Sequence, residues 1–210
     1  MKYRHDLGND RWIVEHIFPG LRNGYFIEAG ATNGLNGSGT FVLESELGWS
    51  GLCVEAIPKQ FEQILRFRNC SADNRALWKT SGEQLEFTIF PNRTGHSGLS
   101  TANKNIARAD FQEETKELVI VSTVTLSDVL REHGAPRVID YFCLDIEGSE
   151  LPVLSTFDFH GEYLIRSFSI EGHSCDDLMR QNGYRQVKNP FTDVDFETYW
   201  LHSSVELTDA

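Results

Sequence analysis

Three carboxylates follow the most apolar stretch in the middle of the chain. Residues 139–144, Ile-Asp-Tyr-Phe-Cys-Leu, lead directly into Asp145, Glu147 and Glu150. A mostly apolar run with β-branched and aromatic residues is typical of a strand buried on both faces of a parallel sheet. Ligands of open α/β sheets bind beyond the carboxyl ends of the strands, so Asp145 and Glu147 are expected to reach a site there. Glu147 and Glu150 also suit the first turn of the following helix.

A second group of candidate residues lies in a glycine-rich turn near the N-terminus. The apolar strand at 24–29 runs into the pattern Glu28-x-Gly30-x-x-x-Gly34. Glycines let the backbone approach a ligand closely, but the G-x-G-x-x-G fingerprint of dinucleotide sites is missing. Glu28 would repel a pyrophosphate and attract an amino group or a sulfonium. The turn therefore favours S-adenosylmethionine over NAD.

Glu55 ends the next apolar strand, 51–56, where an acidic residue commonly accepts hydrogen bonds from both ribose hydroxyls. Its position supports a nucleoside site beside the first turn. The alternative is that Gly30 and Gly34 only form a tight turn and that the acids are surface residues. Because both acids terminate apolar strands at the same predicted edge of the sheet, we favour the nucleoside site.

Composition excludes several other classes of function. The 210 residues include 19 Lys and Arg against 31 Asp and Glu, a formal charge of −12, so nucleic acid is not expected as a partner. The four cysteines are scattered singly, without the paired spacing of a zinc or redox site. Neither a signal peptide nor a membrane span is recognisable, which predicts a cytoplasmic protein with no membrane partner.

The order of predicted elements indicates one α/β domain over residues 1–210. Strands alternate with helices, which predicts a parallel sheet with helical crossovers, and the tail 184–202 reads as a hairpin that adds an antiparallel edge and could support a homodimer. Residues 1–23 are expected to form a helical lead-in, and a short third strand is expected to end near residues 74–78. Residues 91–117 are expected to be a loop followed by a weak helix, with His96 in a segment able to close over the site.

The chain also resembles a known family. Residues 25–34, 43–55 and 139–151, together with Asn-Arg-Ala-Leu at 74–77 and residues 125–130, look like the FkbM-type S-adenosylmethionine-dependent methyltransferases. The resemblance spans about residues 6–190 in the same order. It implies the class I methyltransferase (Rossmann-like) fold, a doubly wound sheet of about seven strands with one antiparallel strand. It also implies methyl transfer to a hydroxyl oxygen of a small molecule such as a sugar or secondary metabolite.

The resemblance and the spacing together assign expected roles to individual residues. Asn74 and Ala76 are expected to flank the adenine, in the manner of the family. The full set expected to bind S-adenosylmethionine is Glu28, Gly30, Thr32, Asn33, Gly34, Glu55, Ala56, Asn74, Ala76 and Asp145.

Methyl transfer to an alcohol requires that the hydroxyl proton be removed. Asp145 is the candidate base, or the group that holds a cation lowering the pKa of the alcohol, and Glu147 and Glu171 are expected near the acceptor. A metal bound by Asp145, Glu171 and His173 is conceivable, but the chain has no specific ligand spacing, so no metal is expected. An NAD-dependent oxidoreductase and a non-catalytic cofactor- or carbohydrate-binding module remain as alternatives.

Overall fold

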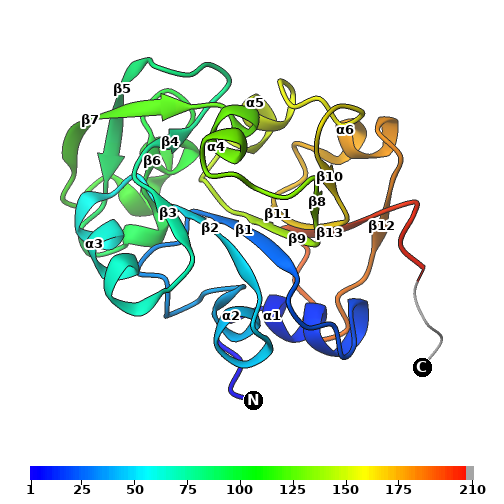
Figure 1. The fold of residues 1–210 in the computed structure, drawn as a ribbon. Helices are drawn as coiled ribbons and strands as arrows, with labels where there is room; N and C mark the ends of the chain where they lie inside the picture. Colours follow the sequence, from blue (N-terminus) through cyan, green and yellow to red (C-terminus); the bar gives the residue numbers. More distant parts are fainter. Residues whose placement is uncertain (207–210) are drawn as a thin grey trace.

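The computed structural model describes residues 1–206, and these form a seven-stranded sheet with helices on both faces (Figure 1). In spatial order the strands are β12 (Tyr184–Val187), β13 (Glu197–His202), β11 (Ser167–Glu171), β9 (Tyr141–Leu144), β1 (Tyr25–Ala29), β2 (Ser50–Val54) and β3 (Ser71–Asp73). β13 runs antiparallel to both β11 and β12, whereas β11, β9, β1, β2 and β3 pair in parallel. The expected mixed α/β class is confirmed.

Two layers of helices enclose this sheet and follow from the alternation of side chains along its strands. Helices α1 (Asn9–Trp12), α2 (Phe41–Leu47) and α3 (Pro58–Phe67) and the π-helix η1 (Ile13–Ile17) lie on one face, and α4 (Leu126–Glu132), α5 (Glu150–Leu154) and α6 (Asp176–Gln181) on the other. Phe26 packs into the first layer and Ile27 into the second. Successive strand residues point to opposite faces, so Glu28 lies on the face of Phe26.

Two of the predicted strands are each divided in two by a polar residue. The run 139–144 becomes β8 (Val138–Ile139) and β9, which are separated by Asp140. The run 163–170, whose apolar character in the sequence also predicts one strand, becomes β10 (Leu164–Ile165) and β11, which are separated by Arg166. Arg166 Nη1 lies 2.7 Å from Asp140 Oδ1, and Asp140 Oδ2 accepts a hydrogen bond from Tyr25 N. This ion pair ties the beginnings of β9 and β11 to β1.

A second sheet of four strands was not predicted. It consists, in spatial order, of β4 (Ala76–Leu77), β7 (Glu117–Val124), β5 (Gln84–Ile89) and β6 (Gly98–Leu99). The predicted third strand is present as β3, which ends at Asp73, one residue before the expected region 74–78, whereas 76–77 forms the separate strand β4 of the small sheet. Asp73 causes the turn between them, since its Oδ1 accepts a hydrogen bond from Arg75 N at 2.9 Å.

The weak helix expected before residue 117 is also wrong. Residues 91–117 contain the 3₁₀ turns η2 (Thr94–His96), η3 (Lys104–Ala107) and η4 (Ala109–Phe111), with β6 between the first two. Asn103 caps η3 with its side chain, and Phe111 is fully buried against Phe90. The segment is held in place without a regular helix because Phe111 packs into the protein interior.

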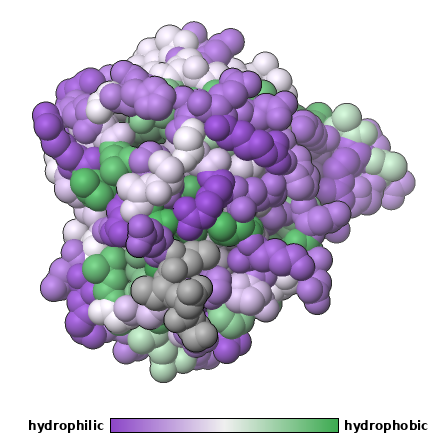
Figure 2. Space-filling model, turned by 90° about the vertical axis from the view of Figure 1, so that its right-hand side faces the viewer, coloured by the Kyte–Doolittle hydropathy of each residue, from purple (hydrophilic) through white to green (hydrophobic). Residues whose placement is uncertain are grey.

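In Figure 1 the chain begins at the bottom of the view below α2, and the last described residues follow β13 at the right-hand edge. The lead-in is helical only from Asn9 to Ile17. Seen from the β12 side, the surface is mainly hydrophilic and its hydrophobic residues gather in separate small areas (Figure 2). None of the helices within residues 1–206 has the length and apolar character that crossing a bilayer would require.

Candidate functional site

A cavity of about 380 Å³ opens beyond the carboxyl ends of the parallel strands. Its acidic lining consists of Asp6, Glu28, Glu55, Asp145, Glu147, Glu171 and Glu197. Leu77, Phe87 and Leu99, from strands β4, β5 and β6, supply an apolar wall. The large sheet thus contributes most of the charged residues of the cavity, and the small sheet contributes its apolar wall.

Asp145 follows the last residue of β9, and its backbone N–H donates to Ala29 O at 3.2 Å. Its side chain is exposed to the cavity, yet protein surrounds the cavity. Burial in this environment raises the pKa of Asp145 well above its usual range, and the carboxylates of Glu171, Glu147 and Glu150 add to the rise. A raised pKa makes the Asp145 carboxylate a stronger base than an ordinary aspartate, which suits a role in proton transfer.

Glu171 and Glu197 face each other directly in the antiparallel ladder of β11 and β13. Like charges at opposed positions destabilise a sheet, so this pairing calls for compensation. Asn9 Nδ2 donates to Glu197 Oε1 at 2.5 Å, and burial raises the pKa of Glu197 to about 7. Protonation of Glu197 near neutral pH therefore relieves part of the repulsion.

Glu147 is held in place by the segment that follows β5. Asn105 Nδ2 donates to Glu147 Oε2 at 2.5 Å, and His96 Nδ1 lies 3.2 Å from Glu147 Oε1. Burial raises the pKa of Glu147 to about 8, with a further contribution from Glu171, whereas burial and nearby arginines lower the pKa of His96. Both shifts favour a neutral pair, in which the carboxyl group donates to the imidazole. Glu147 also has a positive φ of 57°, an unusual conformation that these contacts maintain.

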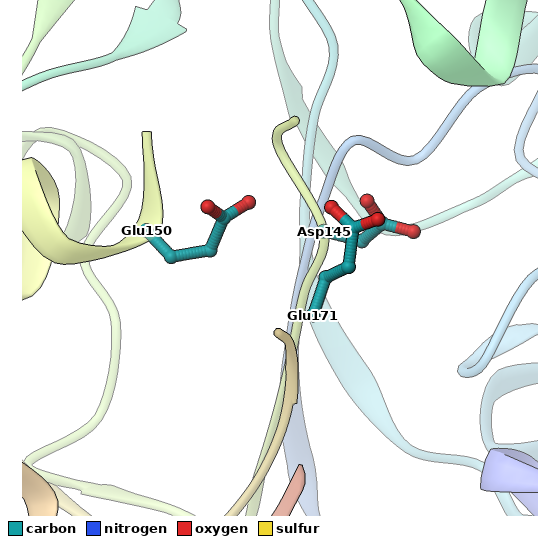
Figure 3. A group of neighbouring side chains, drawn as sticks. All are labelled: Asp145, Glu150 and Glu171. Atoms are coloured by element: carbon teal, nitrogen blue, oxygen red, sulfur yellow. The ribbon is translucent and has the colours of Figure 1, made fainter. Parts of the chain in front are cut away.

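Glu150 closes the loop that carries Asp145 and Glu147. Its two oxygens accept hydrogen bonds from Ile146 N at 2.8 Å and Gly148 N at 3.0 Å. One ligand oxygen each from Asp145, Glu150 and Glu171 lies within 4.8 Å of the others, and the three side chains converge in Figure 3. His173 does not join them, because its ring nitrogens contact Asp176 and Asp195 O.

Glu28 lines the cavity, but its charge is balanced from within the protein. Ser38 Oγ, Thr40 Oγ1 and Gly39 N all donate to its carboxylate, at 2.6–2.8 Å. Arg68 Nη1 lies 3.1 Å from Glu28 Oε2, and both side chains are buried. Glu28 therefore organises the loop after the glycine-rich turn, and the expected attraction for a cationic cofactor is weakened by Arg68.

Glu55 connects the first two loops of the sheet. Its Oε2 accepts from Thr32 N and its Oε1 from Ile57 N, both at 2.8 Å. Burial raises its pKa to about 7, although the two backbone hydrogen bonds act in the opposite direction. Each carboxylate oxygen has a further lone pair, so Glu55 can still accept hydrogen bonds from a ligand.

The remaining predicted cofactor residues fall into two groups. Gly30, Thr32, Ala56 and Ala76 line the cavity. Asn33, Gly34 and Asn74 are not among the lining residues: Asn33 Oδ1 accepts from Leu35 N and Asn36 N, and Asn74 Nδ2 donates to Glu55 O. These three therefore support the loops that form the cavity.

Sequence reasoning missed Glu197, the apolar wall and the contacts of Glu147. Glu197 is the first residue of β13, but its register opposite Glu171 depends on the pairing of β13 with β11, and α6 and β12 lie between these two strands in the sequence. Phe87 and Leu99 were recognisable as strand or loop residues but not as parts of a second sheet. The pair of His96 with Glu147 joins residues 51 positions apart.

Comparison with known families gives one match. The family model described as methyltransferase FkbM domain matches residues 28–185, which run from β1 into β12 and include Glu55, Asp145 and Glu171. A comparison with curated proteins found no match.

Proposed function

Because the chain belongs to the FkbM methyltransferase family, we propose that it transfers a methyl group from S-adenosylmethionine to a hydroxyl oxygen of a small molecule such as a sugar or secondary metabolite. Membership of the family supports methyl transfer. What is proposed is that S-adenosylmethionine is the donor and that a hydroxyl oxygen is the acceptor atom. The observation that carries it is the position of Asp145, whose side chain opens into an acidic cavity beside Glu171 at the carboxyl ends of β9 and β11.

The residues of the cavity fit this donor. S-adenosylmethionine, when bound, supplies an electrophilic methyl group on a positively charged sulfur. Glu55 would accept hydrogen bonds from the ribose hydroxyls with its unused lone pairs, while Leu77 and Ala76 offer apolar surface to the adenine. The acids of the lining favour a cationic ligand. Gly30 keeps the first turn close to Asp145.

On the acceptor side, a carboxylate must either take the hydroxyl proton or hold a cation that makes the hydroxyl more acidic. Asp145 suits both roles, because no side-chain hydrogen bond or ion pair occupies its carboxylate among residues 1–206. Glu171 and Glu147 line the same cavity and would accept hydrogen bonds from other hydroxyls of the acceptor. Orientation of the acceptor oxygen toward the methyl group and exclusion of water complete the requirements.

Calorimetry and a methyl-transfer assay test the proposal. S-adenosylhomocysteine should bind, whereas NAD should not, and tight NAD binding without S-adenosylhomocysteine binding would contradict the assignment. In an assay over hydroxylated acceptors, Asp145→Asn should lower kcat by about 10²–10⁴-fold while the affinity for S-adenosylhomocysteine stays close to wild type. Asp177→Asn, an exposed aspartate on α6, is the matched control and should leave the rate unchanged.

A further inference from the structure

Three carboxylates converge beside the cavity, two from the segment that leads from β9 into α5 and one from the end of β11. Asp145 follows β9, Glu150 begins α5 and Glu171 ends β11, and one oxygen of each lies within 4.8 Å of the others. Figure 3 shows the Glu150 carboxylate pointing from α5 toward those of Asp145 and Glu171. Convergence of this kind costs free energy unless a positive charge accompanies it.

No arginine or lysine supplies that charge in the part of the chain that the structure describes. None of the ion pairs among residues 1–206 includes Asp145, Glu150 or Glu171. Arg68 is committed to Glu28 and Glu44, and Arg75, which lines the cavity, is committed to Asp73 and Glu132.

Ser149, which directly precedes Glu150 in the chain, gives a second indication of a ligand in this cavity. It precedes α5 in the N-cap position, where a serine oxygen ordinarily accepts a hydrogen bond from the helix backbone, but its side chain makes no such bond. Ser149 is only 1% exposed and lines the cavity, and its Oγ has no hydrogen-bond partner within the described residues. A buried hydroxyl without a partner is unusual and implies a group that the protein itself does not provide.

We propose that Asp145, Glu150 and Glu171, supported by Ser149 Oγ, form a binding site for a hard divalent cation such as Mg²⁺. All the available donors are oxygens, and no cysteine or histidine belongs to the group among the described residues, which disfavours zinc or copper. The site escapes sequence analysis because its ligands come from two separate segments of the chain with no fixed spacing. Any role of the cation in polarising the acceptor hydroxyl rests on the proposed function, whereas cation binding itself does not.

Binding of Mn²⁺, a paramagnetic substitute for Mg²⁺, to the chelator-treated full chain at pH 8 tests the site by electron paramagnetic resonance. We expect one saturable site, from which Mg²⁺ displaces Mn²⁺. Glu171→Gln should weaken Mn²⁺ binding by about 10- to 100-fold, and Ser149→Ala by about tenfold. Glu197→Gln is the matched control, because Glu197 lies opposite Glu171 but outside the converging group. The affinity of this variant for Mn²⁺ should stay close to that of the wild type.

Thermal unfolding with and without Mn²⁺ gives a second measurement. At the same Mn²⁺ concentration, the Tm should rise for the wild type and for Glu197→Gln, and by clearly less for Glu171→Gln. Absence of saturable Mn²⁺ binding would overturn the proposal, as would equal weakening by Glu197→Gln and Glu171→Gln, since that indicates only a diffuse negative field. Saturable binding without any methyl transfer would support the cation site and contradict the proposed function instead.

Discussion

Gly30 lies directly against the backbone carbonyl of Asp145, and a Cβ atom at position 30 would overlap that oxygen. The contact is reinforced by the hydrogen bond from Asp145 N to Ala29 O at 3.2 Å. The glycine-rich turn and the segment that carries Asp145 are therefore one structural unit. The turn after β1 positions the carboxylate after β9.

Gly30→Ala should therefore be strongly destabilising. Gly30 has a positive φ of 75° and no room for a side chain, so we expect the free energy of unfolding to fall by about 3 kcal/mol or more in urea denaturation. Gly37→Ala is the control: its φ is 71°, but no atom lies within 4 Å of the added Cβ. Only the cost of the left-handed conformation, about 1–2 kcal/mol, should remain there. Equal losses for the two variants would contradict the close contact.

Arg68→Met should destabilise the protein because it leaves Glu28 buried without its cation. Arg68 is fully buried and pairs with Glu28 and Glu44, so the free energy of unfolding should fall by about 3–5 kcal/mol. The control is Arg131→Met, which removes an exposed partner of Asp128 and should have a much smaller effect. A second substitution, Glu28→Gln, should recover part of the loss in Arg68→Met, and a double variant that recovers nothing would count against the buried pair.

Asn105→Ala should loosen the segment between β5 and β7. The substitution removes the donor to Glu147 Oε2, so we expect a loss of about 1–3 kcal/mol in the free energy of unfolding. Limited proteolysis should cut the variant between residues 91 and 111 earlier than the wild type. Gln112→Ala, an exposed residue of the same segment that bonds only to nearby backbone carbonyls, should change neither measurement.

Glu197 should contribute a pH dependence to stability. Its pKa rises from an ordinary value of 4.5 to about 7 in the folded protein, so the folded state binds more protons than the unfolded state between these values. Stability is then present below pH 4.5 and is lost as the pH rises toward about 7. In Glu197→Gln the free energy of unfolding should fall less steeply across this range than in the wild type. The exposed Glu46→Gln should follow the wild-type curve.

The parts of the fold that follow from local pattern were predictable. Gly48 is typical of a residue that ends a helix, and α2 ends there with Gly48 in the left-handed conformation. The pattern Thr125-x-x-Asp128 is typical of a helix start, and the Thr125 side chain caps α4 through Asp128 N. The apolar runs that lead to Glu55 and Asp145 form parallel strands of the large sheet. In each of these cases the signal lies within a few neighbouring residues.

The parts that depend on distant partners were not predictable. The small sheet pairs β5 with β7 across a segment that resembles a loop and a weak helix in sequence. In the sequence Glu28 indicates a cofactor contact, but in the structure Arg68, 40 residues away, neutralises the charge of Glu28. In the sequence Glu150 indicates only a helix start, but in the structure its carboxylate faces Asp145 and Glu171.

The cavity is divided between two sheets, and under the proposed function this division separates recognition of the acceptor from the chemical step. The converging carboxylates belong to the large sheet and its loops, whereas Leu77, Phe87 and Leu99 belong to the small sheet. A change of size at Phe87 or Leu99 reshapes the space available to an acceptor without replacing any acid. Under the proposed function, we expect the substrate range to respond to substitutions in residues 76–99 while the converging carboxylates stay unchanged.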